Sequence, residues 1–188
     1  MGKSGKLMQI LLLVIGGGIG VVSLYTASMA GVMAKMGLLG ADAGRMIDVN
    51  ELARRTRGMK QEYRCDFGSV VSLIPRYWGA RGDGRLAIMQ KLGEQRIECG
   101  INYVKNGNAE RGVYTMVKGL YYLKNRYLAL RGAVEKERAN CELARDHHYE
   151  AWVEAYLGAS TGNAEQVVLK IYKQVEEERS RVEELCIE

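Results

Sequence analysis

One uncharged segment near the start of the chain constrains the fold more than any other feature. From Leu7 to Ala34 the sequence runs for 28 residues without a charged side chain. As an α-helix this segment would be about 42 Å long, at about 1.5 Å per residue, whereas the hydrocarbon core of a bilayer is about 30 Å thick. Lys3 and Lys6 precede the segment and Lys35 follows it. We therefore predict an N-terminal tail and a single transmembrane helix within residues 1–36, with membrane lipid as a partner.

Two other interpretations of this segment fit less well. A cleaved signal peptide agrees with the basic start and with the small residues of Ser28-Met29-Ala30, but signal cores usually hold only about 7–15 apolar residues. The other interpretation is a helix buried in a soluble core. A chain of 188 residues has little mass with which to cover such a segment on every side.

Small residues recur along the uncharged segment at helical spacing. Gly16, Gly20, Ala27 and Gly31 fall near one face of the expected helix, and small residues let membrane helices approach closely. They predict a packing face for other membrane-protein subunits or for a second copy of this chain. The alternative is that they reflect only the higher frequency of glycine in transmembrane helices.

The rest of the chain has the composition of an all-α domain. From residue 37 onward there are 24 basic and 22 acidic side chains. This balance argues against nucleic acid as a partner, because a nucleic-acid-binding face gathers basic residues on one side. The chain has one proline and one phenylalanine, no alternating pattern persists, and strong helix formers dominate its second half. We predict that an antiparallel bundle of three to four helices follows the transmembrane helix.

Residues 37–84 are expected to form a juxtamembrane helix and a connector. A polar helix is predicted over about 49–64, and its basic residues form a solvated face or touch anionic head groups. Residues 66–84 are the least helical stretch, because Pro75 disfavours helical backbone at the residue before it and several glycines follow. The connector is also apolar and contains Trp78, so we expect it to pack on the bundle or to lie at the membrane interface.

Residues 85–188 show clear helical periodicity. The first helix is expected to end at Asn106-Gly107, a typical C-terminal stop. Asn108 is expected to cap a second helix, which continues through Cys141 to about residue 157, and Asn163 to cap the last. The apolar stripes comprise Leu86, Met89, Gly93, Ile97, Gly100, Ile101 and Val104, then Val113, Met116, Leu120, Leu123, Tyr127, Leu130 and Val134, and finally Val168, Ile171, Val175, Val182 and Leu185.

The cysteines Cys65, Cys99, Cys141 and Cys186 lie on or beside different predicted helices. Their wide spacing excludes zinc knuckles and CxxC redox motifs. They form two disulfides, in any of three pairings, or they are small buried hydrophobes in a reducing compartment.

The orientation of the predicted membrane span is only weakly indicated. The numbers of basic residues at the two ends of the uncharged segment are nearly balanced, and they slightly favour a domain outside the cytoplasm.

The histidine pair His147-His148 is the strongest candidate for metal chemistry. Adjacent residues on a helix point about 100° apart, so the pair would chelate one ion poorly, and Glu150 or Glu154 would complete only a two-ligand site. The Glu-x-x-His motif of di-iron bundles does not occur in the chain. We therefore expect no catalytic residues, no cofactor and no metal. A ligand- or metal-binding sensor domain that uses these histidines is the alternative.

Several stretches match the layout of a known family. They are the connector SLIPRYW, the helix KLGEQRIECGINYVKNGN, the stretch DHHYEAWVEAYLG and the glutamate-rich last helix. Over about 72–185 the chain resembles a family of unknown function in small-genome bacteria, whose members have a single N-terminal anchor, a connector and charged helices. The resemblance implies an extracytoplasmic, membrane-anchored bundle and carries over no functional residues.

These observations predict a non-enzymatic, single-pass membrane protein. Its helical domain, residues 85–188, would serve as a structural or accessory interaction subunit of a larger membrane-associated assembly. Tyrosines are frequent in this domain, and an exposed subset would favour partner binding, because aromatic residues are enriched at interfaces.

Overall fold

A computed structural model describes residues 46–66, 72–137, 141–144 and 148–187. The chain divides into two units, residues 1–39 and 40–188, and every described residue belongs to the second unit. The predicted transmembrane helix, with the packing residues Gly16, Gly20, Ala27 and Gly31, lies outside the described residues. Within the described part of the chain, no helix combines the length and the apolar character needed to cross a bilayer.

The all-α prediction is confirmed for the described residues. They form helices α3 (Val49–Arg55), α5 (Leu73–Gly79), α6 (Gly82–Lys105), α7 (Ala109–Glu137), α8 (Tyr149–Leu157) and α9 (Gly162–Ile187), with a 3₁₀ helix η1 (Cys141–Ala144). The only β-type pairing among these residues is an isolated bridge between Ile47 and Ser160.

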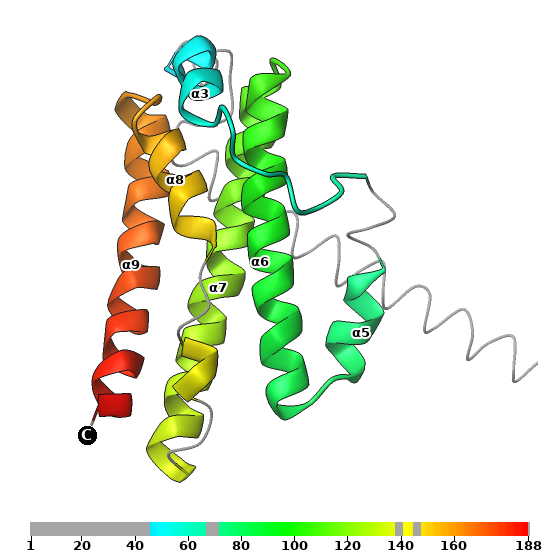
Figure 1. The fold of residues 1–188 in the computed structure, drawn as a ribbon, viewed down its shortest axis with the longest axis vertical. Coiled ribbons are helices and arrows are strands. Elements are labelled where there is room, and N and C mark those ends of the chain that lie inside the picture. Colours follow the sequence, from blue (N-terminus) through cyan, green and yellow to red (C-terminus); the bar gives the residue numbers. More distant parts are fainter. Residues whose placement is uncertain (1–45, 67–71, 138–140, 145–147, 188) are drawn as a thin grey trace, which may run out of the picture. The chain divides into compact units, whose positions relative to one another are not determined.

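The helices form a bundle in which α7 packs against both α6 and α9, and α8 packs against α6 and α9 (Figure 1). Helices α6 and α7 are antiparallel, because they are joined by the short turn at 106–108. Lys124 bonds Gln174 and Arg131 bonds Glu178, so α7 and α9 run in the same direction. Helix α8 is antiparallel to α9, because the short turn at 158–161 joins the two helices. Together η1 and α8 therefore supply the third, broken segment of the bundle.

Four glycines let α6 and α7 approach each other closely. Gly93 and Gly100 on α6 face Gly119 and Gly112 on α7, and in each helix the two glycines are seven residues apart. A Cβ atom at position 100 would lie 2.7 Å from the Gly112 carbonyl oxygen, and one at position 119 would lie 2.6 Å from the Gly93 carbonyl oxygen. Only glycine fits such a contact between two backbones. Around this contact the core includes the fully buried apolar side chains of Leu92, Ile97, Met116 and Leu120.

Two of the predicted helix boundaries are confirmed. The first helix of the bundle ends at Lys105, and Gly107 follows with φ +81°, the left-handed conformation that glycine adopts most easily. The Asn108 side chain accepts a hydrogen bond from the Arg111 N–H at 3.3 Å, as expected of a cap. The cap predicted for the last helix is wrong, because α9 begins at Gly162 and Asn163 lies within its first turn.

Three other sequence predictions of secondary structure are wrong. The polar helix expected over 49–64 is only α3, which ends at Arg55, and Gly58 then adopts φ +89°. The connector is partly helical, because Pro75 sits in the first turn of α5, where backbone N–H groups have no partner within the helix. The long helix expected to reach residue 157 ends at Glu137. An unbroken helix would extend about 73 Å and leave its far half without α6 or α9 to cover it.

Candidate interaction surface

The four cysteines form two disulfides that tie separate segments to the bundle. Of the three pairings left open by the sequence, the structure contains Cys65–Cys99 and Cys141–Cys186, with Cα–Cα distances of 5.3 and 5.7 Å. The first bond fastens the non-helical segment of residues 59–66 to the second half of α6. The second fastens η1 to the last turn of α9. All four cysteines of the chain lie in the described residues, and all are paired.

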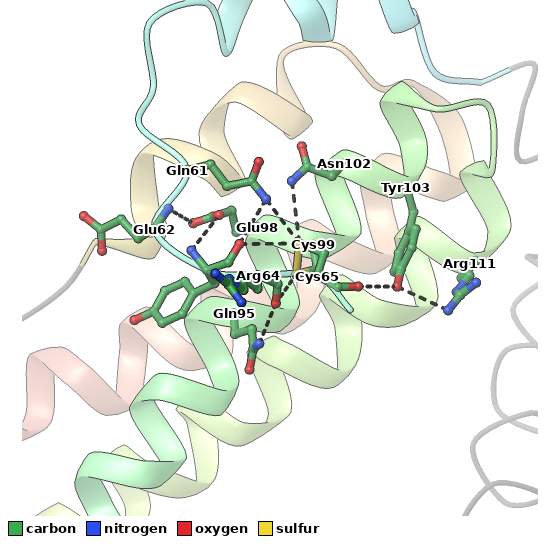
Figure 2. Close-up of a disulfide and its surroundings, with 11 residues drawn as sticks. Gln61, Glu62, Arg64, Cys65, Gln95, Glu98, Cys99, Asn102, Tyr103 and Arg111 are labelled. Atoms are coloured by element: carbon green, nitrogen blue, oxygen red, sulfur yellow. Dashed lines mark hydrogen bonds between the residues drawn. A yellow bond between two sulfur atoms is a disulfide. The ribbon is translucent and has the colours of Figure 1, made fainter. Parts of the chain in front are cut away.

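The segment 59–66, called the strap below, lies along α6 and is held there by side chains of that helix (Figure 2). The Glu98 carboxylate accepts hydrogen bonds from the backbone N–H groups of Glu62 and Tyr63, both at 3.1 Å. Gln95 donates to the Arg64 carbonyl oxygen at 2.8 Å, and the Tyr103 hydroxyl donates to the Cys65 carbonyl oxygen at 3.3 Å. An extended segment lacks internal backbone hydrogen bonds, so α6 supplies them.

Two buried glutamates of α6 therefore have structural partners. Glu98 is only 1% exposed, and burial raises the pKa of its carboxyl group even though the two strap N–H bonds favour the charged form. The Tyr63 hydroxyl donates to Glu94 at 2.7 Å. Burial, followed by this bond to a carboxylate, raises the pKa of the Tyr63 phenol above its ordinary value. Both acids act as acceptors that dock the strap.

The strap leads to α5, whose exposed face is basic and aromatic. Leu73 anchors this helix in the core, whereas Trp78 is 72% exposed. Among the described residues, Trp78 and the C-terminal Ile187 are the large apolar side chains that remain exposed. Arg76, Arg81 and Arg85 surround the tryptophan in sequence and are exposed as well. The prediction that Trp78 lies at an interface stays open, because no partner is present in the structure.

A groove of about 440 Å³ lies between α5, α6 and α7. Its floor is apolar and its rim is polar, with Arg85 and Tyr77 on one side and Asn125 on the other. The Arg85 guanidinium lies 4.8 Å from the centre of the Tyr77 ring and donates to its hydroxyl at 3.0 Å. The Tyr77 ring in turn meets Tyr122 of α7 edge-on, with 6.1 Å between the ring centres.

The same side of the α6–α7 pair carries further cations stacked on tyrosines. Arg96 lies 5.4 Å from the Tyr122 ring centre, and Lys118 lies 4.2 Å from the Tyr114 ring centre. On α7 these residues follow a three- and four-residue spacing, which places them on one helix face. Near the N-terminal end of α7, the Arg111 guanidinium lies 4.2 Å from the centre of the Tyr103 ring. A cation over a ring keeps its full charge, so this side of the domain remains positive.

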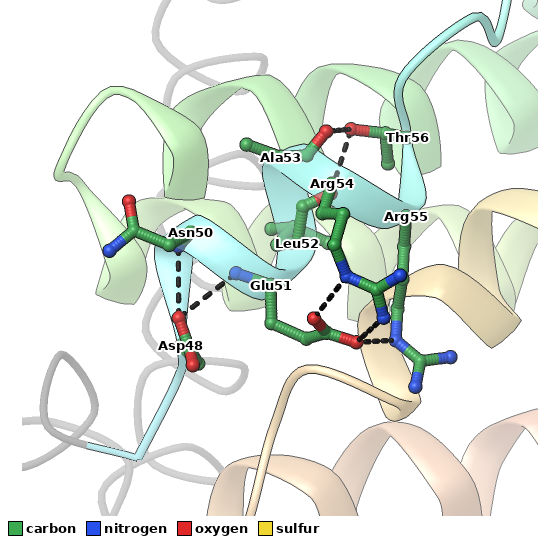
Figure 3. A network of polar contacts seen from close by, with 8 residues as sticks. All are labelled: Asp48, Asn50, Glu51, Leu52, Ala53, Arg54, Arg55 and Thr56. Carbon is green, nitrogen blue, oxygen red and sulfur yellow. Dashed lines mark hydrogen bonds and ion pairs between the residues drawn. The ribbon is translucent and has the colours of Figure 1, made fainter.

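Some cations elsewhere in the described bundle pair with carboxylates. On α3, Glu51 pairs with Arg54 at 2.6 Å and with Arg55 at 2.7 Å (Figure 3). The hydrogen bond from Arg54 is the largest of the effects that lower the pKa of Glu51 to about 2. The basic run predicted to touch head groups or solvent is thus partly neutralised. On α9, Arg181 likewise pairs with Glu177 at 2.6 Å.

A second polar cluster lies between α8 and α9. The Tyr149 hydroxyl donates to Glu176 at 2.9 Å, and Arg179 pairs with Glu176 at 2.7 Å and also with Glu150. Burial is the main cause that raises the pKa of the Tyr149 phenol. A phenol of this kind stays protonated and serves as a hydrogen-bond donor. The cluster fixes the short helix α8 against α9.

Two motifs of the sequence have chemical connotations, the histidine pair and the turn between α8 and α9. His148 is exposed and directly precedes α8, while its neighbour His147 lies outside the described residues. Within the described ranges, no three cysteine, histidine or acidic side chains gather as a metal site would require. Residues 158–162 read Gly-Ala-Ser-Thr-Gly, the spacing of a nucleophile elbow. An elbow joins a strand to a helix, but here the turn joins α8 to α9 and Ser160 is buried.

No family model, no curated protein and no solved structure matches the chain. The resemblance to a family of anchored bundles therefore stays a prediction.

Proposed function

We propose that the chain is a non-enzymatic, single-pass membrane protein whose helical domain works outside the cytoplasm as a structural or accessory subunit of a larger membrane-associated assembly. The observation that carries this proposal is the pairing of all four cysteines in two disulfides. Disulfides persist in oxidising compartments and are rare in the cytosol. This supports the extracytoplasmic side for the domain, to which the charges around the uncharged segment point only weakly.

The sequence supports the anchor. The uncharged segment from Leu7 to Ala34 exceeds the length that a bilayer requires. In this proposal Gly16, Gly20, Ala27 and Gly31 form the face that docks other spans, since association in lipid depends on close packing.

A structural role also agrees with how the polar groups of the domain are used. Glu94 and Glu98 hold the strap, and Tyr149 and Glu176 hold α8, so these polar groups contribute to the architecture. The positive, tyrosine-rich side of α5, α6 and α7 is the surface left for a partner. Aromatic residues and arginine are the types most enriched at protein interfaces.

Native mass spectrometry of gently solubilised membranes tests this proposal. We expect the full-length chain to be released together with other subunits or with further copies of itself. Gly20→Leu should weaken this association, whereas Gly18→Leu, about 160° around the helix from Gly20, should leave it intact. A lone monomer from untreated membranes, or equal effects of the two substitutions, would contradict the proposed role.

A further inference from the structure

The exposed residues of α5 and of the turn after it form a small surface with an unusual composition. It consists of Arg76, Trp78, Arg81 and Arg85, which we call the α5 patch. All four side chains are exposed, and the tryptophan is 72% exposed. Asp83 is the one acidic residue between the first and the last of these arginines. The patch combines a large exposed apolar ring with three exposed arginines, which outnumber the single acidic residue among them.

We propose that the α5 patch binds the surface of an anionic bilayer and lays the domain against the membrane that carries it. Tryptophan is favoured at the level of the lipid head groups, where one part of the ring is dry and the other wet. Arginines near an anionic surface each contribute about 1 kcal/mol of attraction. Trp78 and the three arginines are all exposed, although Arg85 also contacts Tyr77, and one bilayer surface can engage both the ring and the cations.

Contacts with the bundle hold the helix that carries the patch. Leu73 is buried beneath α5, and the Cys65–Cys99 bond holds the strap that precedes it. Tyr77, next to Trp78, is fixed by the Arg85 guanidinium and by its edge contact with Tyr122. A patch held in place loses little conformational entropy when it binds, which favours binding.

The tether keeps the patch near lipid. This step rests on the proposed anchor. If the transmembrane helix ends near Ala34, residues 35–45 connect it to Met46, the first described residue. Eleven residues reach at most about 40 Å, so the domain stays close to the bilayer and a weak contact suffices at such a high effective concentration. Charge complementarity and this short tether favour lipid over a second protein as the occupant.

Quenching of tryptophan fluorescence by labelled lipid tests the proposal. The chain has two tryptophans, so Trp152→Phe leaves Trp78 as the reporter. The full-length variant is reconstituted into vesicles of phosphatidylcholine, with or without phosphatidylglycerol, that contain a lipid brominated near the head group. We expect strong quenching only with phosphatidylglycerol, and its loss in high salt. If Trp152→Phe disturbs the fold, the difference between the wild type and Trp78→Phe gives the same signal.

Charge reversal provides matched variants. Arg76→Glu with Arg81→Glu should lower the ratio of membrane-bound to free domain about fivefold for each arginine removed, and by more because a repulsive charge is added. Lys170→Glu with Lys173→Glu changes the net charge equally at exposed positions of α9 and should leave the quenching unchanged. An equal loss of quenching in both double variants would contradict the proposal that the α5 patch binds the membrane specifically.

The remaining outcomes separate the patch from the anchor. Failure of the chain to float with vesicles of either composition would refute the anchor. Flotation without lipid quenching, with Trp78 open to aqueous iodide, would refute the patch alone. Trp78 shielded from both iodide and labelled lipid would show that protein covers it, which also overturns the proposal. Equal quenching in neutral and anionic vesicles would show that the arginines do not contribute to binding, which contradicts the proposal.

Discussion

Glu98 shows how a single residue attaches a whole segment. Its carboxylate accepts two backbone N–H groups of the strap while it is itself only 1% exposed. The cost of burying the charge and the gain from the two bonds oppose each other, and burial dominates, so the pKa of Glu98 is raised. Because the pKa of Glu98 is raised by folding, this carboxyl group binds a proton more tightly in the folded state than in the unfolded chain.

The contribution of Glu98 to stability should therefore depend on pH. The stabilisation that comes from the raised pKa is fully present below the ordinary value of 4.5 and is lost as the pH rises through the folded-state pKa. In urea unfolding, the free energy of unfolding of the wild type, relative to that of Glu98→Gln, should fall as the pH rises from the ordinary pKa through the folded-state pKa. Glu98→Ala should cost about 1–3 kcal/mol through the N–H groups left without an acceptor, and the amides of Glu62 and Tyr63 should then exchange hydrogen faster. A pH-independent difference between wild type and Glu98→Gln would contradict this account.

Glu51 should behave in the opposite way. Its pKa is lowered to about 2, with the hydrogen bond from Arg54 as the largest cause. The stabilisation is present above the ordinary value of 4.5 and is lost as the pH falls towards 2. We expect Glu51→Gln to lower the urea midpoint slightly at neutral pH and to match the wild type at the acid end of the series. A difference that grows on acidification would show that the Arg54 and Arg55 pairs do not act as described.

At the scale of elements, the α6–α7 pair depends on backbone contact at Gly93, Gly100, Gly112 and Gly119. The periodic stripe of the first helix already included Gly93 and Gly100, so part of this contact could be predicted. Their partners on α7 could not, because only the antiparallel register decides which residues meet. For the same reason the pairs Arg96–Tyr122 and Arg111–Tyr103 could not be derived from spacing within one helix.

The other misses have local causes. The prediction of a non-helical connector fails at Pro75, because proline costs no hydrogen bond in the first turn of a helix. The break after Glu137 is invisible in the sequence because apolar residues recur on both sides of it, and only the limited length of α6 and α9 makes the reversal necessary. The apolar connector and the exposure of an aromatic residue on it were foreseeable from composition, whereas the groove beside it requires the packing of three helices.

Two glycine-to-alanine substitutions in the bundle should have opposite effects. Gly100→Ala places a methyl group 2.7 Å from the Gly112 carbonyl oxygen, so we expect a loss of at least about 2–3 kcal/mol from overpacking or an unfolded product. Gly132→Ala on α7 meets no atom within 4 Å and should stabilise by about 0.5–1 kcal/mol, because alanine favours helix. Thermal unfolding followed by circular dichroism measures both. A mild effect of Gly100→Ala would refute the close backbone contact.

At the scale of the whole molecule, the two disulfides join segments that secondary structure alone would leave loose. The bonds close loops with sequence separations of 34 and 45 residues. One holds the strap against α6, and the other holds η1 against the end of α9.

Removing either bond should therefore destabilise the domain. Cys141→Ser with Cys186→Ser, or Cys65→Ser with Cys99→Ser, should lower the free energy of unfolding by about 2–5 kcal/mol. Hydrogen exchange separates the two: the first pair should speed exchange in η1, and the second in the strap, while the middle of α7 stays protected in both. Faster exchange along the whole of α7 in either variant would mean that the bond is needed for the bundle itself.

The most direct test of the central claim combines location and redox state in one measurement. Membranes from cells that express the full-length chain are washed with alkaline carbonate and treated at once with a maleimide-linked polymer, before and after reduction. The account predicts that the chain stays with the washed membranes and shifts on a gel only after reduction, when its four cysteines become reactive. A chain released by carbonate, or one that shifts before reduction, would contradict a disulfide-stapled domain anchored outside the cytoplasm.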